Sequence, residues 1–161
     1  MAGDPVDVSH LASNVAQIVE PKAAREKIAF TCDIPPDLGT ADLDTANLSA
    51  ALVNILENAI DACTADTAKD AHAISLRVSA DADAVTFDIA DNGMGMSQET
   101  REKAFTLFFS SKGLKGTGLG LFIANDVVKK HGGRIDLTSE AGEGTQFHIV
   151  VPRRKAETTG S

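Results

Sequence analysis

The sequence of 161 residues has no tryptophan and no tyrosine, and only seven phenylalanines. This scarcity argues against a surface on which single-stranded nucleic acid stacks, although phenylalanine alone can form one. Basic residues are also in the minority, because 15 lysines and arginines stand against 23 aspartates and glutamates, for a net charge of −8. This balance disfavours nucleic acid or an anionic membrane as a partner, since tracking phosphates needs an excess of positive charge.

Long apolar runs are missing as well. No stretch approaches the roughly 18 residues of a membrane span, and the first ten residues, MAGDPVDVSH, lack the basic and apolar regions of a secretory signal. The two cysteines, Cys32 and Cys63, lie far apart without metal-ligand spacing. We therefore expect two buried free thiols in a reducing cytoplasm, and no membrane contact.

The length fits a single domain, which buries about two-thirds of its unfolded surface without a disulfide or metal. We expect this domain at residues 1–152, followed by a disordered polar tail at 153–161. Apolar residues at helical spacing predict helices at 6–27, 46–63 and 118–130. Pro21 is expected to kink or restart the first helix, and Asp44 or Thr45 to cap the second.

Alternating apolar residues predict strands at 28–34, 73–79, 84–90, 134–139 and 145–151, with a short extended piece at 38–43. Tight turns join the last four strands into two hairpins. Hairpins combined with helices predict an α+β fold, a two-layer sandwich of a mostly antiparallel sheet with helices on one face. A Rossmann fold is not expected, because the strands do not alternate with crossover helices.

The second predicted helix carries the first polar cluster. Asn54, Glu57, Asn58 and Asp61 are spaced by three and four residues, so they lie on one helix face. Carboxamide and carboxylate oxygens suit Mg²⁺, which is usually shared with substrate phosphates. The same pattern also fits the solvated face of an amphipathic helix.

Two glycine-rich segments follow. In Asp91-Asn92-Gly93-Met94-Gly95-Met96, the aspartate ends a strand and can accept a hydrogen bond from a ligand N–H, while the glycines let the backbone approach a flat ring. The alternative is a tight Asn-Gly turn, but a helix rather than a strand comes next. The second segment, Gly116-Thr117-Gly118-Leu119-Gly120, opens a helix, whose N–H groups and dipole suit an anion. It lacks the lysine of a P-loop, and many helices merely begin in glycine-rich loops.

Between these segments lies FTLFFSSK, residues 105–112. Three phenylalanines within five residues are more often core packing than a ligand contact. Lys112 and Lys115 stand beside the suspected anion site and can pair with phosphate as point charges. The irregular stretch between Met96 and Gly116 is typical of a mobile lid.

The order of these motifs is more specific than any one of them. LVNILENAIDA, DNGMGM, FTLFFSSK, GTGLGLFIANDVVKKHGG and GEGTQFHIVVP follow one another as in the ATP-binding domain of sensor histidine kinases, which this chain resembles from Val6 to Pro152. That family shares a superfamily with gyrase, the ninety-kilodalton heat-shock chaperone and MutL. The resemblance implies the Bergerat-type fold, a mixed sheet backed by three helices, and Mg-ATP as ligand.

The resemblance also implies roles for individual residues. Asp91 would bind the adenine amino group with support from Thr145, and Asn58 would ligate Mg²⁺. The remaining nucleotide-binding candidates are Gly93, Gly95 and Met96 at the base, Asn54 and Asp61 on the phosphate side, Lys112 and Lys115 in the lid, and Gly116, Thr117, Gly118, Leu119 and Gly120 at the phosphates. Asn54 and Glu57 are the candidate catalytic residues.

Two positions distinguish branches of this superfamily. In gyrase and MutL a glutamate four residues before the magnesium asparagine activates water, and here that position is Asn54. Glu57 is acidic, but it lies about 100° around the helix from its neighbour Asn58. The resemblance therefore favours a kinase over a water-activating ATPase. Asp61 departs from the family, which often has a basic residue at that position.

A histidine kinase also needs an acceptor histidine, followed by an acidic residue and then a proline. None of the four histidines, His10, His72, His131 and His148, has this context. We therefore expect the acceptor in a separate dimerisation domain, a response regulator downstream, and an isolated chain that is monomeric and slow or inactive. The alternatives are a stand-alone anti-sigma-type serine kinase and an ATPase clamp for DNA, the latter disfavoured by Asn54 and by the net charge.

Overall fold

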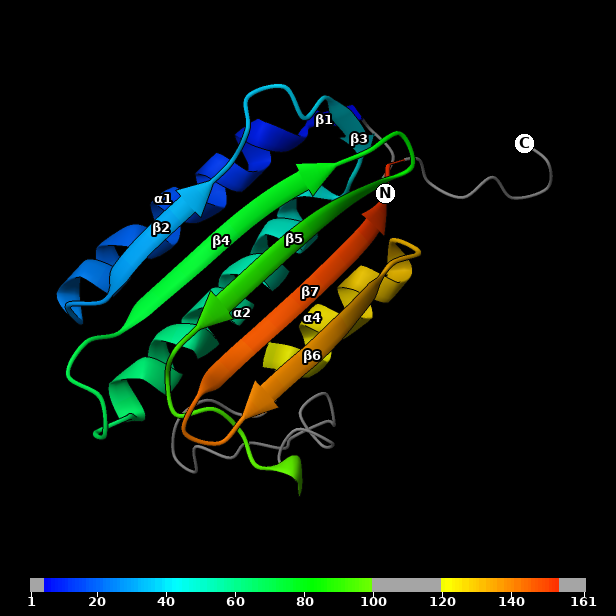
Figure 1. The fold of residues 1–161 in the computed structure, drawn as a ribbon. Helices are drawn as coiled ribbons and strands as arrows, with labels where there is room; N and C mark the ends of the chain where they lie inside the picture. The colour runs from blue at the N-terminus through cyan, green and yellow to red at the C-terminus, as the bar shows by residue number, and fades with distance from the viewer. Residues whose placement is uncertain (1–4, 100–119, 154–161) are drawn as a thin grey trace.

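The computed structural model describes residues 5–99 and 120–153. Helices lie at α1 (Val8–Arg25), α2 (Thr45–Ala65) and α4 (Gly120–Lys130). Strands lie at β1 (Pro5–Asp7), β2 (Ala29–Asp33), β3 (Thr40–Asp42), β4 (Ala73–Ala80), β5 (Ala84–Asp91), β6 (Arg134–Glu140) and β7 (Gly144–Pro152). Five strands form one sheet in the order β2-β4-β5-β7-β6, and β1 pairs with β3 in a separate ribbon (Figure 1).

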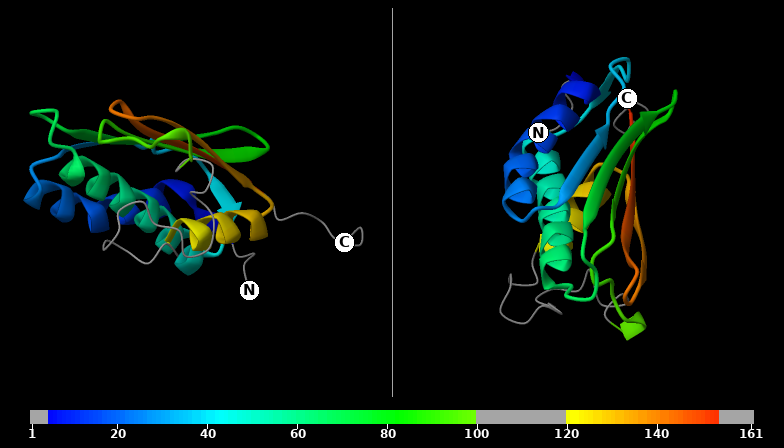
Figure 2. Two further views of the ribbon diagram at one scale, coloured as in Figure 1. Left: turned by 90° about the horizontal axis from the view of Figure 1, so that it is seen from below. Right: turned by 60° about the vertical axis from the view of Figure 1, so that its left-hand side comes forward.

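The sheet is mixed and mostly antiparallel. Among the strands that the structure describes, only the β2–β4 pair is parallel, while β4–β5, β5–β7 and β6–β7 are antiparallel. Helices α1, α2 and α4 cover one face of it, with α2 between the other two (Figure 2). The predicted two-layer sandwich with three helices is therefore confirmed.

The core lies between α2 and the inner face of the sheet. Strand alternation points Leu76, Phe87 and Ile149 inward, and all three are at most 1% exposed. They meet the apolar stripe of α2, which includes Leu52 and Leu56. This packing fixes α2 across the sheet, and hence where the polar residues of its C-terminal half lie.

The opposite sheet face is polar. One lateral row crosses all five strands, because the register places Asp33, Arg77, Asp88, His148 and Asp136 next to one another in turn. Arg77 pairs with Asp33, and His148 pairs with Asp88. Because side chains alternate along each strand, one face of the sheet is apolar and buried and the other is charged.

Several predicted boundaries need correction. Residues 6 and 7 form a strand rather than a helix start, because Val6 pairs with Ala41, and Asp7 caps α1 by accepting from the His10 N–H. Helix α1 runs unbroken through Pro21. The expected cap of α2 is confirmed for Asp44, which accepts the Asn47 N–H, and this hydrogen bond lowers the pKa of the Asp44 carboxyl.

Two further expectations concern single residues. Cys63 is buried as predicted, whereas Cys32 is exposed because β2 is an edge strand in which no residue is fully buried. Arg153, the first residue of the expected tail, donates its N–H to the Asp83 carbonyl and its guanidinium to Thr40 O. Residues 154–161 lie outside the described part of the chain.

Candidate functional site

One small pocket lies where the C-terminal half of α2 faces the ends of β5 and β7. Its lining residues are Asn58, Ala59, Ala62, Asp91, Met94, Gly95, Met96, Thr145 and Phe147. Five of them, Asn58, Asp91, Gly95, Met96 and Thr145, are candidates from the sequence. The fold therefore brings together residues from three segments that are distant in the sequence.

Asp91 and Thr145 form the sheet side of this pocket. Asp91 is the last residue of β5, and the register places it directly opposite Thr145 of β7. One carboxylate oxygen of Asp91 accepts the Gly93 N–H at 2.8 Å, which orients the group. Thr145 is 6% exposed, and its hydroxyl lies 2.8 Å from that of Ser139.

Ser139 is a site residue that the sequence analysis missed. It is 2% exposed, and its hydroxyl accepts the Met96 N–H at 2.8 Å while donating to the Gly144 carbonyl at 2.9 Å. Buried hydroxyl groups need such partners, because an unpaired polar group costs folding free energy. A serine in an alternating strand gives no signal of this role, since it resembles any small inward-facing residue.

The glycines of this region serve contacts between protein segments. A Cβ on Gly93 would lie 2.6 Å from the Ala62 backbone of α2, and a Cβ on Gly95 would lie 2.0 Å from the Glu140 carbonyl oxygen. Gly95 also has a φ of +69°, which disfavours a side chain. The structure thus gives these glycines a packing role, because protein backbone occupies the space that their side chains would need.

The polar side chains of α2 lie in two different environments. Asn58 lines the pocket, and its amide NH₂ donates to the Asn54 carbonyl at 2.9 Å. Glu57 instead forms an ion pair with Lys22 of α1. Asn54, Glu57 and Asp61 are half-buried but are not among the lining residues.

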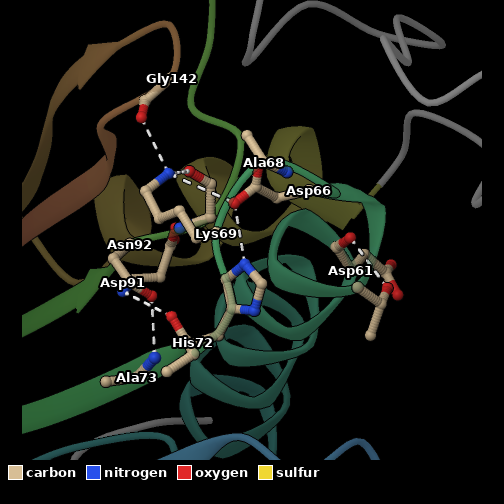
Figure 3. A network of polar contacts seen from close by, with 12 residues as sticks. Asp61, Asp66, Ala68, Lys69, His72, Ala73, Asp91, Asn92 and Gly142 are labelled. Carbon is tan, nitrogen blue, oxygen red and sulfur yellow. Dashed lines mark hydrogen bonds and ion pairs between the residues drawn. The ribbon is translucent and has the colours of Figure 1, made fainter.

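Side chains brace the loop that follows β5. Asn92 accepts the Ala73 N–H at 2.8 Å (Figure 3) and donates to the Ala71 carbonyl at 3.3 Å. The Met94 N–H donates to the Ala62 carbonyl at 3.1 Å. Behind the loop, burial raises the pKa of the Cys63 thiol to about 12, with a smaller contribution from the charge of Asp91. The loop is thus tied to α2 and to β4 on its far side.

Six of the predicted nucleotide contacts lie outside the described residues: Lys112, Lys115, Gly116, Thr117, Gly118 and Leu119. Residues 100–115 of the expected lid lie outside them as well. Gly120 is the first residue of α4. Within residues 5–99 and 120–153, no group of His, Cys, Asp or Glu could hold a metal ion unaided.

A larger cavity of about 400 Å³ lies at the opposite end of α2, between its N-terminus and α4. Asp42, Asp44 and Asp126 line it, against the positive charge of Lys130. Phosphate groups would meet repulsion there. Among the lining residues of the smaller pocket, in which the described residues enclose about 30 Å³, Asp91 is the one carboxylate.

The fold and the pocket define the Bergerat class of ATP-binding domain. Residues 43–155 match the family described as Histidine kinase-, DNA gyrase B-, and HSP90-like ATPase, and the chain belongs to this family. Among solved structures, the nucleotide-free catalytic domain of histidine kinase ThkA gives a TM-score of 0.80 at 26% identity, covering 96% of this chain and 99% of that one. The mycobacterial sensor histidine kinase MprB gives 0.76 at 30% identity, covering 96% and 99%.

Curated relatives narrow the class to sensor histidine kinases. The sensor histidine kinase ZraS of Klebsiella oxytoca is 33% identical over 147 residues, 91% of this chain and 31% of that protein. The C4-dicarboxylate transport sensor protein DctB of Rhizobium meliloti is 32% identical over 94% of this chain and 24% of its own length. The chain thus spans under a third of both relatives and corresponds to an ATP-binding catalytic domain of a two-component kinase. In the described residues no helix is both long enough and apolar enough to cross a membrane.

Proposed function

We propose that this chain binds Mg-ATP in the pocket around Asp91 and supplies the γ-phosphoryl group for autophosphorylation of a histidine. The observation that best supports this is the convergence of Asn58, Asp91 and Thr145 on one pocket. In this proposal the Asp91 carboxylate accepts a hydrogen bond from the adenine amino group. Thr145 supports that contact through its backbone or a water molecule, and Gly95 and Met96 border the base.

Asn58 fits the role of a magnesium ligand. Because its NH₂ group donates to the Asn54 carbonyl, the orientation of the amide is set and its oxygen lies on the other side. Amide oxygens suit Mg²⁺, which takes most of its other ligands from water and substrate phosphates. When bound, the ion would neutralise charge on the transferring phosphoryl group. We place Asn54 and Asp61 on the phosphate side of the site.

Glu57 remains a candidate catalytic residue. Its ion pair with Lys22 directs it toward α1, so a role in the reaction requires that pair to open. The catalytic work expected of this chain is therefore positioning: it holds the nucleotide so that the acceptor is in line.

The acceptor histidine belongs, in this proposal, to a separate dimerisation domain. Three histidines of this chain are already bonded. His72 pairs with Asp66, His148 pairs with Asp88, and His131 accepts the Asp44 N–H through Nε2. The relative named as a sensor histidine kinase supports histidine over serine as the acceptor. The proposal also places the chain in the cytoplasm, with a response regulator downstream.

Calorimetric titration with ATP, in magnesium and in EDTA, tests the binding half. We expect Asn58→Ala to weaken binding about tenfold or more in magnesium only, and Asp91→Asn to weaken it under both conditions. Asn47→Ala is the matched control, because Asn47 lies on the same helix at the far end. No binding by the wild type, or an Asn58→Ala variant that keeps its full magnesium dependence, would refute the proposal.

Labelling of the full-length protein with [γ-³²P]ATP tests the transfer half. A phosphohistidine is lost in acid and survives alkali, whereas a phosphoserine survives acid. We expect an acid-labile product that depends on Asp91. An acid-stable product would favour the serine kinase and overturn the assignment.

A further inference from the structure

The loop between α2 and β4 carries a lysine that ties two other loops together. The Lys69 ammonium lies 3.2 Å from the Gly93 carbonyl, 2.8 Å from the Gly142 carbonyl and 3.3 Å from the Asp66 carboxylate (Figure 3). An ammonium has three N–H donors. Each N–H of the Lys69 ammonium therefore has one acceptor, and these acceptors belong to three separate segments of the chain.

The negative charge that anchors this lysine is the Asp66 carboxylate, which His72 holds in place. His72 Nε2 lies 2.8 Å from one Asp66 oxygen, and the Ala68 N–H donates to the other at 3.2 Å. These bonds, the histidine contact foremost, lower the pKa of Asp66 to about 2, so the carboxylate is ionised at neutral pH. The Asp66 side chain is 7% exposed and that of Lys69 is 27% exposed. We call Asp66, Lys69 and His72 the lysine clamp.

One of the two carbonyls that Lys69 binds belongs to the loop that lines the pocket, and the other belongs to the β6–β7 turn, which is hydrogen-bonded to that loop. Gly93 directly precedes Met94 and Gly95, which both line it. Gly142 lies in the β6–β7 turn, and its N–H donates to the Met94 carbonyl at 2.8 Å. Nothing lies within 4 Å of a Cβ built on Gly142. Gly142 is therefore held in place by its backbone hydrogen bonds and not by packing against neighbouring atoms.

We infer that Lys69 is a positioning residue for the nucleotide. Lys69 is absent from the pocket lining, so it acts through the loops that it joins. Its ammonium fixes the separation of the loop after β5 from the β6–β7 turn, and thereby the shape of the base-binding wall at Met94 and Gly95. This inference rests on the proposed function, because it presupposes that the base occupies this pocket.

The test compares Lys69→Met, Lys69→Arg and the control Lys130→Met. Methionine keeps an apolar stem without donors, and arginine keeps the charge. Lys130 also forms an ion pair, with Asp126, but at the far end of α4. Titration with ATP in magnesium and in EDTA is combined with hydrogen exchange of the nucleotide-free chain.

We expect Lys69→Met to weaken ATP binding by about tenfold, by the same factor in magnesium and in EDTA, because it acts at the base rather than at the phosphates. Lys69→Arg should recover most of the affinity, and Lys130→Met should not change it. In Lys69→Met, residues 92–96 and 141–144 should exchange faster, while β2 keeps its protection. This local pattern distinguishes positioning from a general loss of stability.

Three results would overturn the inference. The first is unchanged ATP affinity in Lys69→Met. The second is an affinity loss confined to magnesium, which would place Lys69 at the phosphates. The third is unchanged exchange at residues 92–96, and this readout still applies if the wild-type chain binds no ATP. In that case the proposed function fails on titration, while the exchange data alone decide whether the clamp holds the two loops.

Discussion

Gly95 and Gly142 offer a direct test of how tightly the pocket wall is packed. Both have a left-handed φ, +69° and +83°, so alanine at either position costs roughly 1–2 kcal/mol of backbone strain. A Cβ on Gly142 meets nothing within 4 Å, whereas one on Gly95 would lie 2.0 Å from the Glu140 carbonyl oxygen. Forcing atoms into a packed site costs about 1–3 kcal/mol more. We therefore expect Gly95→Ala to lose roughly 1–3 kcal/mol of unfolding free energy beyond Gly142→Ala.

Urea unfolding followed by circular dichroism measures this difference, since the chain has no tryptophan for fluorescence. For a chain of this size, each kcal/mol corresponds to about 2–4 °C in Tm, so thermal unfolding gives an independent check. Equal losses in the two variants would refute the reasoning, because strain alone would then account for both. A Gly95→Ala variant as stable as the wild type would show that the loop relaxes without cost.

Three further predictions concern burial and charge. Ser139→Ala should lower the unfolding free energy by about 1–3 kcal/mol in urea, because the Met96 N–H loses its buried acceptor; a loss below about 0.5 kcal/mol would contradict this. A thiol reagent at pH 8 should modify exposed Cys32 in the folded chain and Cys63 only after unfolding, since burial raises the pKa of Cys63 to about 12; two fast thiols in the folded chain would count against it. The folded pKa of Asp66 is lowered to about 2, so its stabilisation is complete above the ordinary carboxyl pKa and is lost as the pH falls toward 2. The stability gap between wild type and Asp66→Asn, measured by urea unfolding at each pH, should hold above about pH 5 and narrow between about pH 4 and pH 2; a gap that is constant down to pH 2 would refute the assignment.

The layers of the fold follow from periodicity. The apolar stripe of α2 and the alternation in β4, β5 and β7 each indicate one buried face, and two such faces can only be buried against each other. The ribbon of β1 and β3 could not be predicted in this way. Val6 fits the apolar spacing of the helix that follows it, and only a distant partner, Ala41, decides that it is a strand.

The residues of the candidate site likewise differ in whether the local sequence or only the fold identifies them. Asp91 and Asn58 could be found because each stands in a motif with a polar residue at an unusual place. Ser139 and Lys69 could not, since their roles depend on carbonyls and amides of segments that lie far away in the sequence. A local contact such as the Asp44 cap can be predicted, because the backbone N–H that it binds is three residues away. Backbone groups of distant segments leave no trace in the amino-acid pattern, so residues that bind them are found only when the fold is known.

The arrangement around the pocket also indicates which part of it must yield to a ligand. Asp91 is paired on both sides, with Ile74 of β4 and Thr145 of β7, so the sheet wall is held by two ladders. The space of about 30 Å³ holds no more than a few water molecules, far less than a base. Met94 is 41% exposed, and methionine changes rotamer more readily than a packed strand moves. Flexible side chains at the rim would therefore have to move for the proposed base to enter, while the hydrogen-bonded loops behind them stay in place.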